Sequence, residues 1–247
     1  MLQRVNDGES GRQRAALPRL EWRLPAILST TDGAVDVIGF LVFGGLFTAH
    51  ITGYLVVVAA HYVTGRFGQV GPILAVPVFI TVLAVVVLLF GGIANGGKTR
   101  RSLLVLHAAL LAGCLALGLR FGPFSNADAP VAVLAGMLAV AAMATQNALV
   151  KLALVESPST AVMTTNTTQL IVDLAALVRS ADEPDKLSKT GRRARVTFLC
   201  MAGFVAGCVA GAVLELRFGV GALVLPVILA TLAVPLGEQK GRTYEQF

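Results

Sequence analysis

The chain has 247 residues, of which 55% are hydrophobic and only 14% are charged, whereas about 25% of the residues in soluble domains are charged. A water-soluble protein this apolar could not cover its surface with polar groups, so the composition excludes a soluble globular domain. The net charge of +6 does not indicate nucleic-acid binding, because the Lys and Arg residues adjoin apolar stretches without interleaved aromatic residues. Basic residues in such places are typical of topology signals and of contacts with anionic lipid head groups.

Six apolar stretches are long enough to cross a bilayer, which takes about 20 residues in helical form and somewhat fewer when flanking residues reach the interface. The first contains Asp32 and Asp36, and the third contains His107. The sequence therefore predicts an all-α, polytopic bundle of transmembrane helices whose surroundings are the lipid bilayer. In chain order the stretches are 24–44, 71–93, 103–119, 129–150, 196–214 and 220–235.

Two further segments, 46–63 and 161–178, begin with polar residues and become aliphatic only afterwards. Stretches rich in Thr and Gly compete with helical hydrogen bonding. We therefore expect each segment to enter unwound and to continue as a half-length or re-entrant helix. The polar heads contain Thr48, His50, Thr52 and Gly53 in the first segment, and Thr164, Thr165, Asn166 and Thr168 in the second.

The order span, polar-headed segment, span, span occurs twice, which predicts two related halves at 24–120 and 129–236 between tails at 1–23 and 237–247. Six crossings place the basic loops at 98–101 and 179–195 and both tails in the cytoplasm. Three crossings per half then give an inverted repeat. Eight crossings would make the halves parallel and would leave fewer basic residues inside, so six crossings fit the positive-inside rule better.

Asp32 and Asp36 are the sharpest functional candidates, because their i,i+4 spacing places both carboxylates on one helical face. An ionised Asp in hydrocarbon costs roughly 2.5–3.5 kcal/mol on insertion scales, so each must face a partner, a cavity or the bundle interior. Two neighbouring carboxylates suit a proton-coupling site. The alternative for Asp32 is a helix cap at a helix that begins with Gly33.

The polar heads form a second group of candidate residues. Thr48, His50 and Thr52 would share one face of an extended stretch, where hydroxyls, free backbone groups and helix N-termini can hold a small polar or anionic solute. The alternative is that Thr and Gly only permit close helix packing.

Polar residues at the end of the fourth apolar stretch extend this set. Gln146 and Asn147 are candidates because Asn147 aligns with Asp36 if the second half carries a five-residue insertion near 155–159. Lys151 could neutralise an aspartate or could reach the cytoplasmic interface, and Asp173 is a weaker member of the same set.

Gly203, Gly207 and Gly211 form two overlapping G-x-x-x-G units, which predict close helix packing within the protomer or between protomers of a homo-oligomer. The three cysteines lie in apolar stretches without metal-ligand spacing, which favours small core residues without a disulfide. No phosphate-binding loop, zinc-protease or serine-hydrolase motif occurs. The sequence therefore predicts no enzyme, no cofactor and no metal.

Several stretches resemble the YoaK family of bacterial integral membrane proteins, which is defined by a domain of unknown function. The likeness runs over about 24–235, and it implies an architecture rather than an activity. Two places depart from the family pattern: Thr52-Gly53-Tyr54 stands where the family reads Thr-Gly-Asn, and Thr168-Gln169-Leu170 stands where it reads Thr-Gly-Thr. The stretches that carry the resemblance are 31–36, 47–53, 144–148, 164–168 and 203–211.

These features favour a secondary transporter or facilitator of a small polar or anionic solute in the bacterial cytoplasmic membrane. The expected site lies where the two polar heads meet, with Asp36 as a proton-coupling carboxylate. A membrane scaffold that uses the glycine face, and a membrane-embedded lipid-modifying enzyme, are the alternatives.

Overall fold

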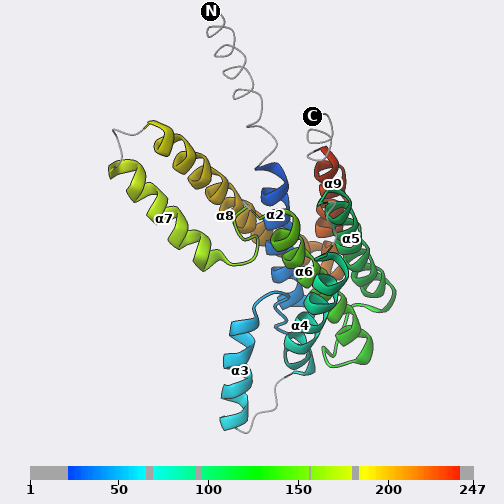
Figure 1. The fold of residues 1–247 in the computed structure, drawn as a ribbon. Helices are drawn as coiled ribbons and strands as arrows, with labels where there is room; N and C mark the ends of the chain where they lie inside the picture. Colours follow the sequence, from blue (N-terminus) through cyan, green and yellow to red (C-terminus); the bar gives the residue numbers. More distant parts are fainter. Residues whose placement is uncertain (1–21, 65–68, 93–95, 156, 180–183, 240–247) are drawn as a thin grey trace, which may run out of the picture.

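The computed structural model describes residues 22–64, 69–92, 96–155, 157–179 and 184–239. These residues form α-helices and one 3₁₀ turn, and no β-strand occurs among them, which confirms the predicted all-α class (Figure 1). The tails at 1–21 and 240–247 lie outside the described residues. The elements are α2 (Arg23–Val42), α3 (Ile51–Thr64), α4 (Val70–Phe90), α5 (Gly96–Phe121), α6 (Pro130–Ala153), α7 (Met163–Arg179), α8 (Pro184–Phe218), η1 (Gly219–Leu223) and α9 (Val224–Gln239).

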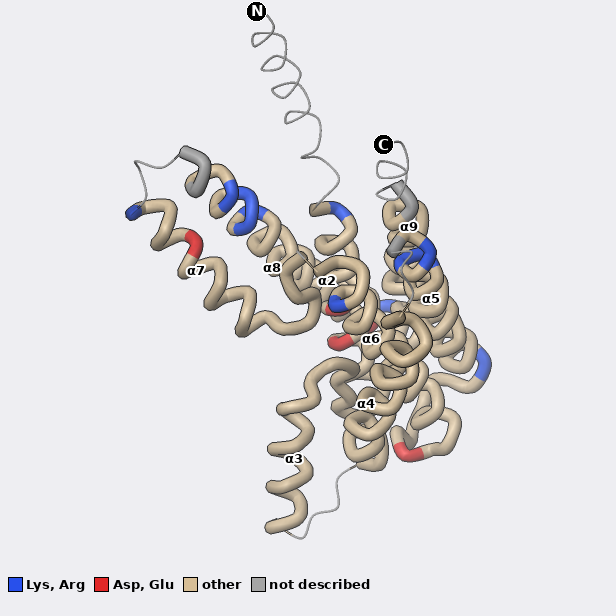
Figure 2. Tube along the Cα trace, in the orientation of Figure 1, with Lys and Arg blue, Asp and Glu red and all other residues tan. Residues whose placement is uncertain are grey.

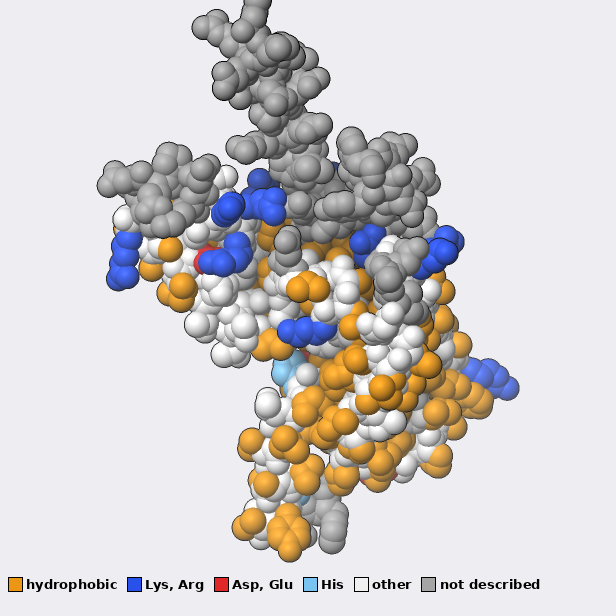
Figure 3. Space-filling view, in the orientation of Figure 1, with side chains coloured by type: hydrophobic (Ala, Val, Ile, Leu, Met, Phe, Trp, Pro, Cys, Tyr) orange, Lys and Arg blue, Asp and Glu red, His pale blue; other side chains and the backbone are white. Residues whose placement is uncertain are grey.

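The six predicted apolar stretches fall on five helical spans that are long and apolar enough to cross a membrane. Four of these spans are α2, α4, α5 and α6, and a fifth continuous stretch, Leu187–Gly237, covers α8, η1 and α9. Large hydrophobic side chains are exposed along these helices, as with Leu88 and Val209, and they cover the lower and right-hand part of the surface in Figure 3. Helices that expose apolar faces in this way are suited to lipid. The chain is a multi-pass helical membrane protein.

The two polar-headed segments differ from these spans in length and direction. Helix α3 has 14 residues and is therefore about 21 Å long, which is short of the ~30 Å hydrocarbon core. Helix α7, with 17 residues, is also absent from the candidate spans found among the described residues. Both helices begin near the middle of the molecule and run toward opposite ends of it (Figure 1).

The helix boundaries correct two of the expectations. The second polar head is not unwound: α7 begins at Met163, and the hydroxyls of Thr167 and Thr168 donate to the carbonyls of Met163 and Thr164, so that these threonines are satisfied within a helix. Likewise, both expected basic loops are helical where described: residues 98–101 belong to the start of α5, and the segment 179–195 is helical from Pro184 onward, because α8 continues upstream and packs beside α7 (Figure 1).

The predicted glycine surface of α8 packs within the protomer, against α2. A Cβ atom at Gly207 would overlap the Thr30 carbonyl, and one at Gly203 would lie 2.8 Å from the carbonyl oxygen of Ala26. Gly33 of α2 fits in the same way against the backbone of Phe204. Because no side chain separates the two backbones, α8 closely covers the face of α2 around Gly33.

Basic residues gather at one end of the molecule, over the starts of α2, α5 and α8 and the end of α7 (Figure 2). The end of α9 lies at this same end, since the Arg100 Nε of α5 donates to the Gly237 carbonyl at 2.6 Å. The start of α5 therefore lies beside the end of α9. Asp173 pairs with Arg193 between α7 and α8, which ties this hairpin together.

Candidate functional site

The loop at 43–50 joins α2 to α3 and begins with a sharp reversal. Gly44 and Gly45 have φ angles of +64° and +82°, a left-handed conformation that glycine adopts without steric cost. The Gly45 amide donates to the Phe40 carbonyl at 2.8 Å, which closes the end of α2. The loop therefore turns back along α2, and its polar residues reach the middle of that helix.

Asp36 of α2 holds this loop. Its Oδ1 accepts hydrogen bonds from the Thr48 amide at 2.8 Å and from the Thr48 hydroxyl at 2.6 Å, and its Oδ2 lies 2.9 Å from the Nδ1 of His50. Asp36 is buried, whereas the His50 side chain is 44% exposed. A buried carboxylate is thus linked through a histidine to the surface of the site. Histidine is the side chain best suited to exchange a proton near neutral pH.

The second half repeats this arrangement with different side chains. Gln146 of α6 donates through its Nε2 to the hydroxyl of Thr160 at 3.0 Å, and Thr160 lies in the loop at 154–162 that precedes α7. Thr48 and Thr160 each stand three residues before the first residue of the following helix. In both halves, a buried polar side chain of the leading helix therefore holds a loop threonine.

Both loops are tied to α2, the first directly at Asp36 and the second through Gln146 of α6. The same Gln146 Nε2 donates to the Leu28 carbonyl at 3.2 Å, and Leu28 lies two turns before Asp36, or about 12 Å along the helix axis. Asp32 stands between these two points, fully buried, and neither of its carboxylate oxygens has a hydrogen-bond partner among the described residues. Since α2 runs unbroken from Arg23, Asp32 is in mid-helix and is not a cap.

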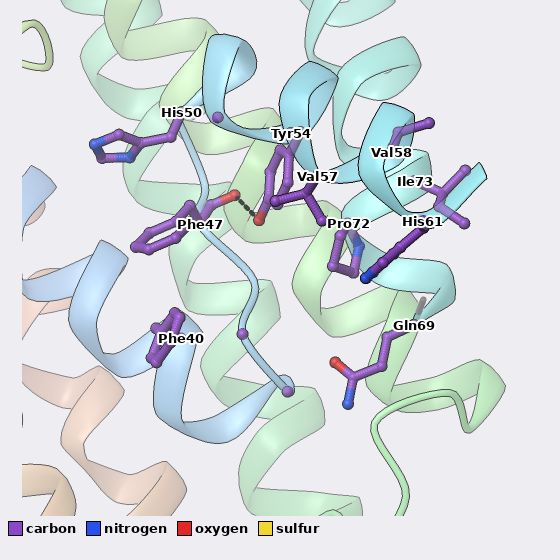
Figure 4. A pocket seen from close by; sticks show the side chains of 13 residues that line it. Phe40, Phe47, His50, Tyr54, Val57, Val58, His61, Gln69, Pro72 and Ile73 are labelled. Carbon is purple, nitrogen blue, oxygen red and sulfur yellow. Dashed lines mark hydrogen bonds between the residues drawn. The ribbon is translucent and has the colours of Figure 1, made fainter. Parts of the chain in front are cut away.

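A pocket of roughly 540 Å³ opens beside the first loop (Figure 4). Phe47 lies at one wall, with its ring 5.0 Å from that of Phe40 and 4.9 Å from that of His50. Tyr54 donates its hydroxyl to the Phe47 carbonyl at 2.7 Å and so fixes the loop. The lining is mainly apolar, with the ring of His61 and the amide of Gln69 as polar groups. The His50 ring lies at the edge and points away from His61 (Figure 4).

Several predicted site residues lie elsewhere. Thr52 and Gly53 are exposed in the first turn of α3, although Gly53 lines the pocket. Asn166 is buried but donates to the Ser159 carbonyl, which fixes the start of α7. Thr164, Thr165 and Thr168 are exposed on α7, and within the described part of the chain none of them contacts Thr48.

Three further polar candidates, Asn147, Lys151 and Asp173, also have other partners or lie at the surface. Asn147 donates to Met143 of its own helix. Lys151 is exposed and forms no ion pair with Asp32 or Asp36 in the described part of the chain. Asp173 belongs to the α7–α8 hairpin. Within the described ranges, no group of three or more His, Cys, Asp or Glu side chains could hold a metal ion.

Sequence reasoning missed Thr160 and Tyr54, and also the polar pocket residues His61 and Gln69. Thr160 follows Ser157-Pro158-Ser159, a turn-forming stretch that marks a loop rather than a helix, and this signal could have placed the unwound segment before α7. Tyr54 was noted only as a departure from the family pattern. A large aromatic residue with a polar tip in an otherwise aliphatic helix is itself a sign of a buried hydroxyl contact.

A family model described as "Protein of unknown function (DUF1275)" matches residues 24–236. No curated protein and no solved structure matches the chain. The matched range covers α2 through α9 except for the last residues of α9, and hence both polar loops and the turns of α2 to which they are tied. The chain belongs to this family of proteins of unknown function.

Proposed function

We propose that the chain is a secondary transporter or facilitator of a small polar or anionic solute in the bacterial cytoplasmic membrane, with proton coupling through Asp36. The observation that carries the proposal is that two interrupted segments are tied to neighbouring turns of α2. The first loop binds Asp36 of α2, and the second binds Gln146 of α6, which in turn donates to the Leu28 carbonyl of α2. Secondary transporters bind solutes at such interruptions, because half-helix ends and free backbone groups can contact solute and ion there.

An inverted repeat accounts for the arrangement of the two halves. Helices α3 and α7 run in opposite directions from the middle of the molecule (Figure 1), as half-helices do when they enter a membrane from opposite faces. The contact between Arg100 and Gly237 joins the basic start of α5 to the end of α9. This placement supports six crossings, with the basic end of the molecule and both tails in the cytoplasm.

In this proposal the pocket binds the solute, whereas Asp36 and His50 carry the proton. The pocket beside Phe47 holds the solute, whose apolar part contacts aromatic side chains and whose polar group reaches His61 and Gln69. Protonation of Asp36 would weaken its hold on His50 and on the Thr48 loop. The same residues that carry the proton thus control the loop that forms one wall of the pocket.

The scaffold alternative depends on the glycine face of α8 as a partner surface. Helix α2 occupies that face within the protomer. The chain could still form homo-oligomers through its lipid-exposed helices. The resemblance to YoaK proteins is compatible with the family match and remains an interpretation of the same stretches.

Val57→Trp in α3 should reduce solute flux to the level of protein-free liposomes. Val57 lines the pocket and points into it (Figure 4), so that an indole would fill the solute volume. Val56→Trp is the matched control, because the Val56 side chain is 69% exposed and does not line the pocket. The measurement is uptake of labelled monocarboxylates, dicarboxylates and amino acids into proteoliposomes with an inward proton gradient. Uptake of none of them, or equal uptake by both variants, would contradict the proposal.

A further inference from the structure

Asp32 is the least satisfied polar group in the middle of the bundle. It has no exposed surface, and neither carboxylate oxygen has a hydrogen-bond partner among the described residues. Two other fully buried oxygens nearby share this condition: the hydroxyl of Ser29, one turn earlier on α2, and the Oε1 of Gln146. A buried anion without a partner is strongly unfavourable, so the Asp32 carboxyl is neutralised there either by a proton or by a bound cation.

The Gln146 amide lies at the turn of α2 that carries Asp32. Its Nε2 donates to the Leu28 carbonyl, which in a regular helix is also the acceptor of the Asp32 amide hydrogen. The orientation of the side-chain amide is fixed, because a backbone carbonyl can only accept and must therefore face the nitrogen. With both amide hydrogens directed at Leu28 and Thr160, Oε1 is left as a free acceptor beside this turn.

These oxygens do not satisfy one another. A carboxylate and an amide oxygen are both acceptors, and no hydrogen bond joins either of them to Ser29. A metal cation of about the size of Ca²⁺ lies roughly 2.3–2.6 Å from its oxygen ligands, which leaves those ligands about 3–5 Å from one another. Asp32 and Gln146 adjoin the same turn of α2 without a hydrogen bond between them, and their oxygens are of the type that such an ion binds.

The charges around this turn are of one sign. Asp36 lies one turn further along α2 and adds a second carboxylate. On the side of α8, the backbone atoms of Phe204 and Cys208 adjoin Gly33, and the Cys200 thiol adjoins Ser29. His50 is engaged with Asp36, the Nδ1 of His107 lies 3.0 Å from the Ala142 carbonyl of α6, and Lys151 is exposed and unpaired with either carboxylate. The local field therefore favours a cation.

We propose that Asp32, Gln146 and Ser29 form a binding site for a sodium ion between α2 and α6. Asp32 supplies the charge, and the amide and hydroxyl oxygens supply neutral ligands of the hard type that such cations prefer. The role of this ion as a coupling ion rests on the transport function proposed above. The binding itself does not.

The test is thermal unfolding of the purified full chain in detergent, without solute, in sodium chloride, potassium chloride or choline chloride at equal ionic strength. An ion that binds only the folded protein raises its melting temperature in proportion to the logarithm of ion concentration above the dissociation constant. We expect this rise in sodium and not in choline. Asp32→Asn and Gln146→Leu should abolish the rise, and the control Asp128→Asn, in an exposed loop, should retain it.

Equal melting temperatures in sodium and choline, or a sodium-dependent rise that persists in Asp32→Asn, would overturn the proposal. If Asp32→Asn does not fold, direct binding of radioactive sodium to wild type and to Ser29→Ala decides the question. Wild type should bind one ion saturably, and Ser29→Ala about tenfold more weakly, which corresponds to one lost neutral ligand. Sodium binding without solute flux would contradict only the proposed transport, and flux without sodium binding would contradict only this site.

Discussion

Gly207→Val is expected to prevent stable folding, with a loss of about 3 kcal/mol or more in the free energy of unfolding. Any Cβ atom at this position would overlap the Thr30 carbonyl and approach the Ala34 amide. These obstacles are backbone atoms, so no change of side-chain rotamer relieves the overlap. Helices α2 and α8 would have to separate, and the close cover over the Gly33 face of α2 would be lost with the contact.

The matched control is Ala206→Val, which adds the same branched side chain one residue earlier, on the exposed side of α8. Detergent-solubilised protein would be compared by size-exclusion profile and melting temperature. The control should give a monodisperse peak close to wild type, and Gly207→Val should aggregate or melt at a much lower temperature. Similar behaviour of both variants would show that the glycine face does not hold the bundle together.

Asp36→Leu is expected to destabilise the protein by roughly 2–6 kcal/mol, because the buried Thr48 amide and hydroxyl would each lose their acceptor at about 1–3 kcal/mol. Both groups now donate to the same carboxylate oxygen. Asp36→Asn keeps an oxygen at this place but cannot bind and release a proton. It should therefore fold with a melting temperature near that of wild type.

The two variants separate structure from coupling. In proteoliposomes, Asp36→Asn should allow downhill equilibration of solute but should not accumulate it against a gradient when an inward proton gradient is imposed. Normal accumulation by Asp36→Asn would remove Asp36 from the coupling step. A wild-type melting temperature in Asp36→Leu would mean that the Thr48 contacts do not hold the loop.

The membrane spans could be predicted from sequence, because a lipid surrounding imposes long apolar stretches that few other constraints produce. The close packing at Gly203–Gly211 was predicted for a similar reason, since repeated small residues at helical spacing have few other uses in a membrane. Only the structure showed that the surface they face is α2 rather than a second protomer.

The unwound segment of the second half could not be located from composition alone. Threonine is compatible with both an irregular segment and a helix, because its hydroxyl can bond a carbonyl four residues earlier. Thr164 through Thr168 follow the second course. The irregular segment ends instead at Val162, where the Ser159 hydroxyl accepts the Val162 amide.

The pairing of Asp36 with Asn147 failed to identify the loop contact for a related reason. Adjacent residues in a helix point about 100° apart, so an alignment displaced by one residue selects the wrong face. Gln146 faces α2 and Thr160, whereas Asn147 bonds Met143 of its own helix. Only the orientation of α6 against α2 decides between the two side chains.

The side of the membrane on which the start of α5 lies tests the central claim most directly. A Gly97→Cys reporter would be placed in a chain whose Cys114, Cys200 and Cys208 are replaced, and intact cells would be treated with a membrane-impermeant thiol reagent. Six crossings and opposed half-helices predict that Gly97→Cys is protected until the membrane is opened. Labelling from outside intact cells would mean that α3 crosses fully and that the halves are parallel, which would contradict the convergent site at α2.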